Sequence, residues 1–199
     1  MGRMRAVRVH ITDAELARRR TIGLDRWDEL WDGVWHLTPA PSLEHQRILD
    51  ELIIFLGRHL MVGGRGILRS GINVFRESAD YRIPDLTFVA SGREHLFHED
   101  GVRGGGPDAV IEIRSPEDET YDKLPFYAAI GTREVIVVER DTKRPEILRL
   151  AGSRHVTLQP DADGWLRSET MNVRFKAVEG HPPRLRVEDA LDQTTHAEI

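Results

Sequence analysis

Two short stretches carry the strongest signal for a β-sheet: Arg82-Ile83-Pro84-Asp85-Leu86-Thr87-Phe88-Val89-Ala90 and Asp108-Ala109-Val110-Ile111-Glu112-Ile113-Arg114. Both are rich in Val, Ile and Leu, so strands are predicted over 85–90 and 109–114. A carboxylate among such residues is costly to bury without a partner. Two of them, followed by a lysine at Lys123, suit a metal-dependent phosphodiesterase: the carboxylates hold Mg²⁺, and the cation orients water or steadies the charge on phosphate.

The two acidic residues can meet if these strands pair. Side chains alternate between the faces of a strand, so Glu112 and Arg114 share one face. Pro84 favours a strand edge or start and leaves Asp85 near the end of the sheet, where a cleft can form. The structural alternative is a buried ion pair between Glu112 and Arg114.

Composition places the chain among ordinary globular proteins. Its 199 residues are enough for one domain with a core, and 40% are hydrophobic and 31% charged. There is no cysteine, and no apolar run approaches the ~18 residues of a membrane span. We therefore expect a cytoplasmic protein that does not insert in a membrane. A net charge of -5 argues against a protein that coats nucleic acid, although a nuclease with a few cations in one cleft remains compatible.

The N-terminal third predicts two helices and a hairpin. Thr12-Asp13-Ala14-Glu15 is a capping box that opens a helix through about Arg20. Asp32-Gly33 is the two-residue turn of a hairpin. Ser42 caps a long amphipathic helix that ends at Gly63-Gly64. The apolar positions of that helix are spaced by three and four: Ile48, Leu49, Leu52, Ile53, Leu56 and Leu60.

The rest of the chain is predicted to form strands, apart from two short helices. A helix is predicted over 122–130, because Pro125 is tolerated only in a first turn and Gly131 suits the position after the last turn. Lys123 then lies in the first turn. β-Hairpins are expected beyond Glu146, and 187–191 is interpreted as a short closing helix. The remaining strands of the middle are predicted over 67–69, 72–76 and 135–140.

Several aromatic and titratable residues allow two interpretations. His45 lies on the apolar side of the long helix, where it is either a core histidine or part of a cleft rim. Glu29, beside the hairpin turn, is a second candidate for the rim. Trp27, Trp31 and Trp35 could form a platform for stacked bases, but packing around the hairpin is the simpler explanation.

An ordered set of short motifs resembles the Uma2 family, also called DUF820, of bacterial restriction-endonuclease-like proteins in the PD-(D/E)XK nuclease superfamily. The match runs from about residue 27 to 190. The motifs are Glu29-x-x-Asp32-Gly33, Pro39-x-Pro41-x-x-x-His45, Arg82-x-Pro84-Asp85, Gly106-Pro107-Asp108-Ala109-Val110-Ile111-Glu112, Ser115-Pro116, Asp122-Lys123-x-x-x-Tyr127 and Gly131-x-x-Glu134.

The resemblance implies an α/β (mixed α+β) fold with a restriction-endonuclease-like core, in which helices flank a mixed central β-sheet and extra β-hairpins are attached. We accordingly expect a helical extension over 1–26, a single domain over 27–191 and a tail over 192–199. The resemblance also implies a site. Asp85 and Glu112 are expected as Mg²⁺ ligands, with the backbone carbonyl of Ile113 as a third ligand.

The catalytic cation is expected at one of two positions. Arg114 stands where the superfamily has its lysine, two residues after the glutamate, and Lys123 looks like a migrated substitute. Lys123 would orient the attacking water and Arg114 would contact the scissile phosphate. A first-turn lysine points back toward the helix N-terminus and can reach the end of a sheet.

The expected activity is that of a metal-dependent endodeoxyribonuclease, a hydrolase that uses Mg²⁺ or Mn²⁺ and acts on DNA. A homodimer would suit the cutting of both strands, although no residue of the sequence points to one. The competing interpretation is a DNA- or protein-binding module that keeps the nuclease fold without turnover.

Overall fold

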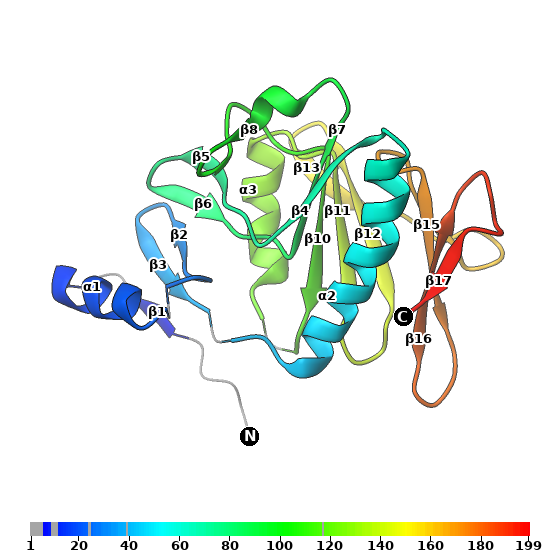
Figure 1. Ribbon diagram of the computed structural model, residues 1–199, viewed down its shortest axis with the longest axis horizontal. Helices are drawn as coiled ribbons and strands as arrows, with labels where there is room; N and C mark the ends of the chain where they lie inside the picture. The colour runs from blue at the N-terminus through cyan, green and yellow to red at the C-terminus, as the bar shows by residue number, and fades with distance from the viewer. Residues whose placement is uncertain (1–5, 9–11, 24, 39, 117) are drawn as a thin grey trace.

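The computed structural model describes residues 6–8, 12–23, 25–38, 40–116 and 118–199. In this part of the chain the strands form three sheets, and the helical segments include three α-helices (Figure 1). The helical segments are α1 (Asp13–Thr21), α2 (Leu43–Leu56) with a π-helical continuation η1 (Gly57–Val62), the 3₁₀ turns η2 (Glu94–Leu96) and η3 (Thr120–Lys123), and α3 (Leu124–Ala129).

The central sheet is mixed and contains both strands predicted to carry the acidic residues. Its spatial order is β13 (Arg154–Thr157), β12 (Pro145–Ala151), β11 (Glu134–Glu139), β10 (Ala109–Arg114), β7 (Leu86–Ala90) and β4 (Gly66–Ser70). β10 and β11 are parallel, while β7 and β10 are antiparallel with Ile111 opposite Leu86. One step further along this register, Glu112 lies opposite Asp85, which immediately precedes β7.

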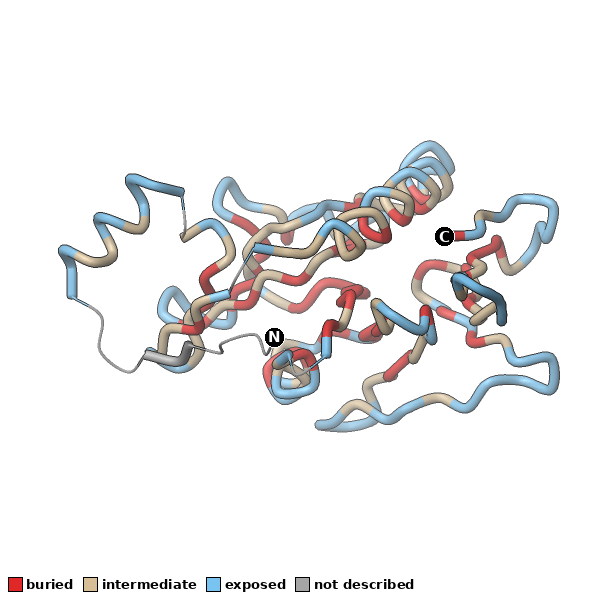
Figure 2. Tube along the Cα trace, turned by 90° about the horizontal axis from the view of Figure 1, so that it is seen from below, coloured by how far each residue is buried: buried red, intermediate tan, exposed pale blue. Residues whose placement is uncertain are grey.

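Helices cover the two faces of the central sheet. Ile48, Leu52 and Leu56 of α2 are fully buried against one face, as their spacing predicts. On the other face, Phe126 and Tyr127 of α3 pack against Val110 of β10 and its neighbours. In Figure 2 the buried residues run through the strands between the helical layers. The strand β10 is therefore covered on both sides, and only its end can be reached from solvent.

A second sheet, at the N-terminal side, forms around the predicted hairpin. Asp32 and Gly33 both have positive φ (46° and 84°), which a two-residue type I′ turn requires, so this prediction is confirmed. The order in this sheet is β1 (Ala6–Arg8), β3 (Val34–Leu37), β2 (Glu29–Trp31), β6 (Asp80–Arg82), β5 (Val74–Glu77), β9 (Gly101–Val102) and β8 (Phe97–His98). The hairpin holds Glu29 beside the end of the central sheet. The predicted helix start is also confirmed, because Thr12 is the N-cap of α1 and its hydroxyl accepts from the amide of Glu15.

A third sheet corrects the prediction of a closing helix over 187–191. Its order is β14 (Leu166–Ser168), β15 (Val173–Val178), β16 (Arg184–Asp189) and β17 (His196–Glu198). Leu185 and Val187 are buried and alternate with arginines, a period of two that fits a strand. The segment expected as a tail contains β17, which pairs with β16, and Ile199 is 2% exposed.

The short helix before β11 begins later than predicted. α3 starts at Leu124, Pro125 lies in its first turn as expected, and Gly131 follows its end with φ of 82°. Lys123 is the last residue of η3 and the N-cap of α3, instead of a first-turn residue. None of the described helices is long and apolar enough to cross a membrane.

Candidate active site

The end of β10 brings the two predicted acidic residues together. Glu112 is 4% exposed, and its side chain faces the layer of α3. Asp85 continues the line of β7 and accepts a hydrogen bond from the amide of Ile113 at 2.6 Å. The bond fixes the Asp85 carboxylate at the sheet end, next to Glu112.

His45 reaches the same point from the opposite helical layer. The Ser42 hydroxyl caps α2 by accepting from the His45 amide, which sets the first turn of the helix. The His45 Nε2 atom lies 2.9 Å from Asp85 Oδ1, and the His45 side chain is 12% exposed. His45 is thus both well buried and part of the site, so the two interpretations of this residue are compatible.

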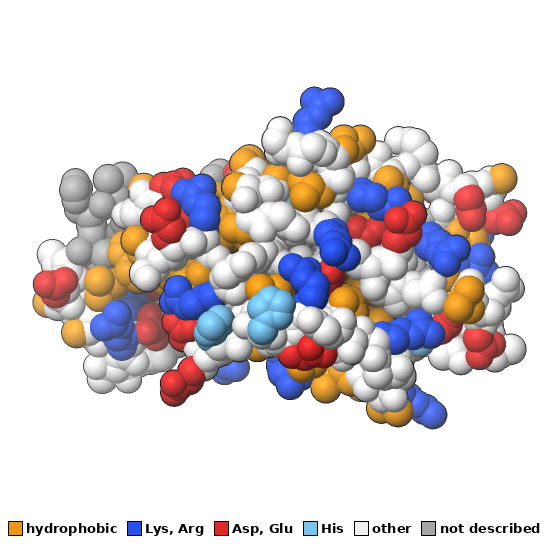
Figure 3. Space-filling view, turned by 90° about the horizontal axis from the view of Figure 1, so that it is seen from above, with side chains coloured by type: hydrophobic (Ala, Val, Ile, Leu, Met, Phe, Trp, Pro, Cys, Tyr) orange, Lys and Arg blue, Asp and Glu red, His pale blue; other side chains and the backbone are white. Residues whose placement is uncertain are grey.

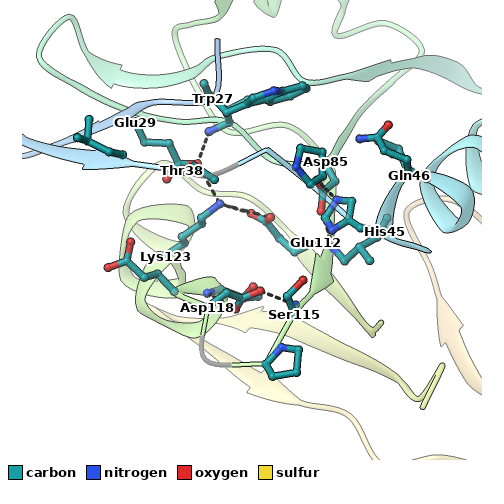
Figure 4. Close-up of a pocket in the computed structure, with 18 residues that line it drawn as sticks. Trp27, Glu29, Thr38, His45, Gln46, Asp85, Glu112, Ser115, Asp118 and Lys123 are labelled. Carbon is teal, nitrogen blue, oxygen red and sulfur yellow. Dashed lines mark hydrogen bonds and ion pairs between the residues drawn. The ribbon is translucent and has the colours of Figure 1, made fainter. Parts of the chain in front are cut away.

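Lys123 joins Glu112 to a third carboxylate. Its Nζ atom lies 2.9 Å from Glu29 Oε1 and 3.2 Å from Glu112 Oε1. Tyr127, four residues along on α3, donates its hydroxyl to Glu112 Oε1 at 2.6 Å. Figure 4 shows Lys123 between Glu29 and Glu112. The ammonium and the phenol together hold the buried carboxylate of Glu112 in place.

Glu29 is held equally firmly by the N-terminal hairpin. Its Oε1 atom accepts from the amide of Ile83, and its Oε2 atom accepts from the Trp31 indole at 2.7 Å. The Trp31 ring stacks on His36, with ring centroids 3.8 Å apart, and on the Arg82 guanidinium. Trp31 therefore serves packing and positioning, which agrees with the simpler of the two explanations for the tryptophans.

The cluster carries more negative than positive charge. Three carboxylates, of Glu29, Asp85 and Glu112, surround the single ammonium of Lys123, and all four side chains are at most 19% exposed. Burial, opposed by the nearby Lys123, raises the pKa of Glu112 to about 7. The surrounding carboxylates outweigh burial for Lys123 and raise its pKa, so its ammonium stays charged. This excess of negative charge favours a further cation.

These residues form the floor of a cavity of about 170 Å³ at the sheet end (Figure 4). The wall includes the loop that follows β10, which is shaped by hydrogen bonds from the Ser115 and Thr120 amides to Asp118. The remaining lining residues come from α2, from the N-terminal hairpin and its flanking loops, from the link between β6 and β7, and from the same loop after β10: Trp27, Leu37, Thr38, Pro41, Gln46, Leu49, Ile83, Pro116 and Glu119.

Arg114 lies elsewhere. It is not among the described residues that line the cavity, and its guanidinium pairs with Glu139 and lies 5.0 Å from the centre of the Tyr121 ring. Glu139 lies directly opposite Arg114 on the neighbouring strand β11. The two opposite charges therefore pair across the strands, and the guanidinium is directed to Glu139 and not to Glu112. The expected shared cleft of Arg114 and Lys123 is therefore not observed, and neither is a Glu112–Arg114 ion pair.

The donor set suits a hard divalent cation. Carboxylate and carbonyl oxygens are the ligands that Mg²⁺ prefers, and Mg²⁺ usually needs only one or two protein carboxylates besides water and phosphate. Among the described residues, no group of three or more acidic or histidine side chains is arranged as a complete metal site. Asp85 and Glu112 supply two carboxylates. The carbonyl of Ile113 lies on the same strand edge as its amide, which faces Asp85.

The geometry defines a class of protein: a mixed α+β fold with a cluster of carboxylates and a lysine at the end of its central sheet. Comparisons with known proteins agree with this class. The family model of Uma2, described as "Putative restriction endonuclease", matches residues 24–177, and the chain belongs to this family. No curated protein matches the chain.

One solved structure has a similar fold. It is described as "a putative nuclease belonging to DUF820" from Anabaena variabilis ATCC 29413. The TM-score is 0.58 at 16% sequence identity, over 72% of this chain and 82% of that one. The similarity establishes the restriction-endonuclease-like fold.

Sequence reasoning gave Tyr127 no role, and it placed Glu29 only at the rim. The spacing of four between Lys123 and Tyr127 was a usable signal, since residues four apart share a helix face. Nothing in the local sequence around Glu29 indicates that it contacts Lys123, because the two residues are 94 positions apart and meet only in the folded chain.

Proposed function

We propose that this protein is a Mg²⁺-dependent nuclease that hydrolyses phosphodiester bonds of DNA, with Mn²⁺ as a substitute ion. The observation that carries the proposal is the excess of buried carboxylate over ammonium at the end of β10. Such a cluster is costly unless a cation joins it. Membership of Uma2 and the printed description of the similar structure support the same class of activity.

Asp85 and Glu112 would hold the ion, with the Ile113 carbonyl as a further ligand. When bound, Mg²⁺ supplies charge neutralisation at the phosphate and lowers the pKa of a bound water. The contacts of Asp85 with His45 and with the Ile113 amide, and the contact of Glu112 with Tyr127, support this role. These contacts fix the carboxylates before a substrate arrives, so little reorganisation is needed during the reaction.

Lys123 would orient the attacking water. An ammonium has three donors, and Glu29 and Glu112 account for two of them. The third can hold the water or a phosphate oxygen inside the cavity. Hydrolysis then adds the water oxygen to phosphorus and breaks one P–O ester bond, and the leaving oxygen takes up a proton, which gives a phosphate monoester and an alcohol.

Arg114 fits a phosphate contact less well than Lys123 does, because it lies with Glu139 outside the cavity. Its contact with the scissile phosphate therefore stays a prediction that the Arg114→Ala variant tests. His45 and Glu29 are assigned to positioning, of Asp85 and Lys123 respectively.

The test combines metal binding with cleavage. Mg²⁺ should raise the melting temperature of the wild type, because a ligand of the folded state stabilises it. Asp85→Asn and Glu112→Gln should each abolish that rise and abolish the nicking of plasmid DNA in Mg²⁺ or Mn²⁺. The control variant Glu146→Gln alters an acidic residue of the same sheet that does not line the cavity, and it should behave as wild type.

Two outcomes would contradict the proposal. Equal nicking by the wild type and both site variants would indicate a contaminating nuclease. DNA binding without any metal-dependent cleavage would favour a binding module that keeps the fold without turnover.

A further inference from the structure

The outward side of α2 carries an exposed apolar strip. Eight large hydrophobic side chains are exposed among the described residues, and four of them lie on α2 and its continuation η1: Leu43, Ile54, Met61 and Val62. Leu43 and Val62 are 88% and 83% exposed, and Ile54, between them, is 71% exposed. In Figure 1 α2 lies in front of the central sheet. Exposed apolar side chains that gather on one helix mark an interaction surface, which singly scattered ones do not.

The same strip carries two charged side chains that lack a partner within the chain. Asp50 precedes Ile54 by four residues and Arg58 follows it by four, and all three are exposed. Residues four apart share a helix face, so the three lie in one row. Neither Asp50 nor Arg58 forms an ion pair with another described residue. They are about two turns apart, ~12 Å along the axis, which is too far for them to pair with each other.

This row is complementary to itself about Ile54. Consider a second copy of α2 packed antiparallel to the first, with a two-fold axis that passes by Ile54. Asp50 then lies opposite Arg58 of the second copy, and Arg58 lies opposite its Asp50. The two Ile54 side chains meet at the axis, and Leu43 comes within about one turn of Val62 of the second copy. Both copies use the same surface patch, as a closed two-fold dimer requires.

Other pairings of the same strip place like charges together. In a parallel pair related by a two-fold axis each residue faces itself, so Asp50 would face Asp50 and Arg58 would face Arg58. An antiparallel pair centred between Leu52 and Ile53 would set Arg58 against Arg47. Like charges that face each other across an interface cost affinity and disfavour the arrangement. Of these three arrangements, the antiparallel one centred on Ile54 is the one that pairs opposite charges.

The surroundings of the strip leave room for a second copy. A hollow beside it is bounded by Ile54, Phe55 and Val62 on one side and by 194–197 on the other, and it can receive side chains of a facing helix. His45 and Leu49 line the active-site cavity from the opposite side of α2. On the face of the molecule shown in Figure 3, basic and acidic side chains lie intermixed, so the charge of this face favours neither an acidic nor a basic partner.

We infer that two copies of this chain associate through the outward side of α2, packed antiparallel, with Ile54 at the two-fold axis and Asp50 facing Arg58 of the second copy. This inference is independent of the proposed nuclease activity. Because one helix of each copy supplies most of the contact, the interface lies at the small end for protein complexes, and the expected dissociation constant is on the order of 10 µM.

The test is sedimentation equilibrium of the full chain from about 1 to about 200 µM, a range that brackets the expected dissociation constant. The mass of the wild type should rise with concentration from the 22.7 kDa of one chain toward twice that value. Ile54→Glu places two like charges at the axis and should weaken association at least tenfold, to be read as roughly tenfold or more in the dissociation constant. Because Ile54 is exposed, this variant should melt like the wild type at low concentration. Val156→Glu is the matched control, since Val156 is an exposed residue on the edge strand β13, and it should associate as the wild type does.

An exchange of charges tests the register. Asp50→Arg and Arg58→Asp, made singly, each set like charges against each other and should weaken association about tenfold. The double variant Asp50→Arg/Arg58→Asp restores opposite charges across the axis, so its dissociation constant should return to within about threefold of the wild type.

Three outcomes would overturn the inference. The first is a wild type that stays at the mass of one chain at the highest concentration. The second is an Ile54→Glu variant that associates as strongly as the wild type. The third is a double charge exchange that associates no better than the single variants, because the antiparallel register centred on Ile54 would then be wrong.

Discussion

Replacing Lys123 by methionine should destabilise the protein strongly. The substitution keeps the length of the side chain and removes the ammonium that lies 2.9 Å from Glu29 and 3.2 Å from Glu112. Two buried carboxylates then lose their shared counter-charge. Removal of one partner from a buried ion pair costs roughly 3–5 kcal/mol. At ~2–4 °C per kcal/mol for a chain of this size, the melting temperature should fall by an amount on the order of 10 °C.

The stability lost in Lys123→Met should be larger at high pH than at low pH. Burial already raises the pKa of Glu112 from 4.5 to about 7, so the folded state holds this proton more tightly than the unfolded state. The stability that the group contributes is full below pH 4.5 and is lost as the pH rises through about 7. Without Lys123 the pKa of Glu112 rises further. Lys123→Met should therefore be closer to the wild type at pH 5.5 than at pH 8.5.

Lys143→Met is the matched control. Lys143 is also buried, with 4% of its side chain exposed, and it pairs with Glu44 at 2.7 Å. Glu44 is 42% exposed and keeps its contacts with Arg47, so its charge stays solvated. Thermal denaturation of both variants at the two pH values is the assay. A Lys123→Met variant that melts as the wild type does, or that loses the same stability at both pH values, would refute the reasoning.

Three other predictions concern the same site. Tyr127→Phe removes the hydroxyl donor to Glu112, which should cost about 1–2 kcal/mol of stability. Because the pKa of Glu112 then rises, the acid limb of the pH–rate profile should move to higher pH, and an unmoved limb would count against the contact. Mg²⁺ affinity measured by calorimetry should increase between pH 6 and pH 8, since Glu112 must lose its proton to bind a cation; a flat affinity would exclude Glu112 as a ligand. Lys123→Ala should lower the cleavage rate ~100-fold or more while metal binding persists, whereas Arg114→Ala should retain most of the rate. The reverse order would move the catalytic role to Arg114.

The local elements of this protein could largely be predicted from sequence, because their signals are short-range. Ser42 and the spacing of Ile48, Leu52 and Leu56 define α2 through capping and a helical period. Asp32-Gly33 defines the hairpin through positive φ angles. The prediction was wrong for 187–191, because 187–189 end the strand β16, which alternates with a period of two and pairs with β15 and β17, the strands directly before and after it in the chain.

The candidate site depends on contacts that no local pattern encodes. The sequence by itself indicated that Asp85 stands at the start of one strand and Glu112 inside another, since the alternation of side chains follows from residue type. That the two strands pair and bring the carboxylates together was decided by the tertiary structure. Only the tertiary structure decided which cation accompanies them. Arg114 is nearer in sequence to Glu112, yet its cross-strand neighbour Glu139 pairs with it, and Lys123 arrives from another layer. Which charged groups pair depends on the distance between them in space and on how far they are desolvated. Packing sets both the distance and the desolvation, and separation along the chain sets neither.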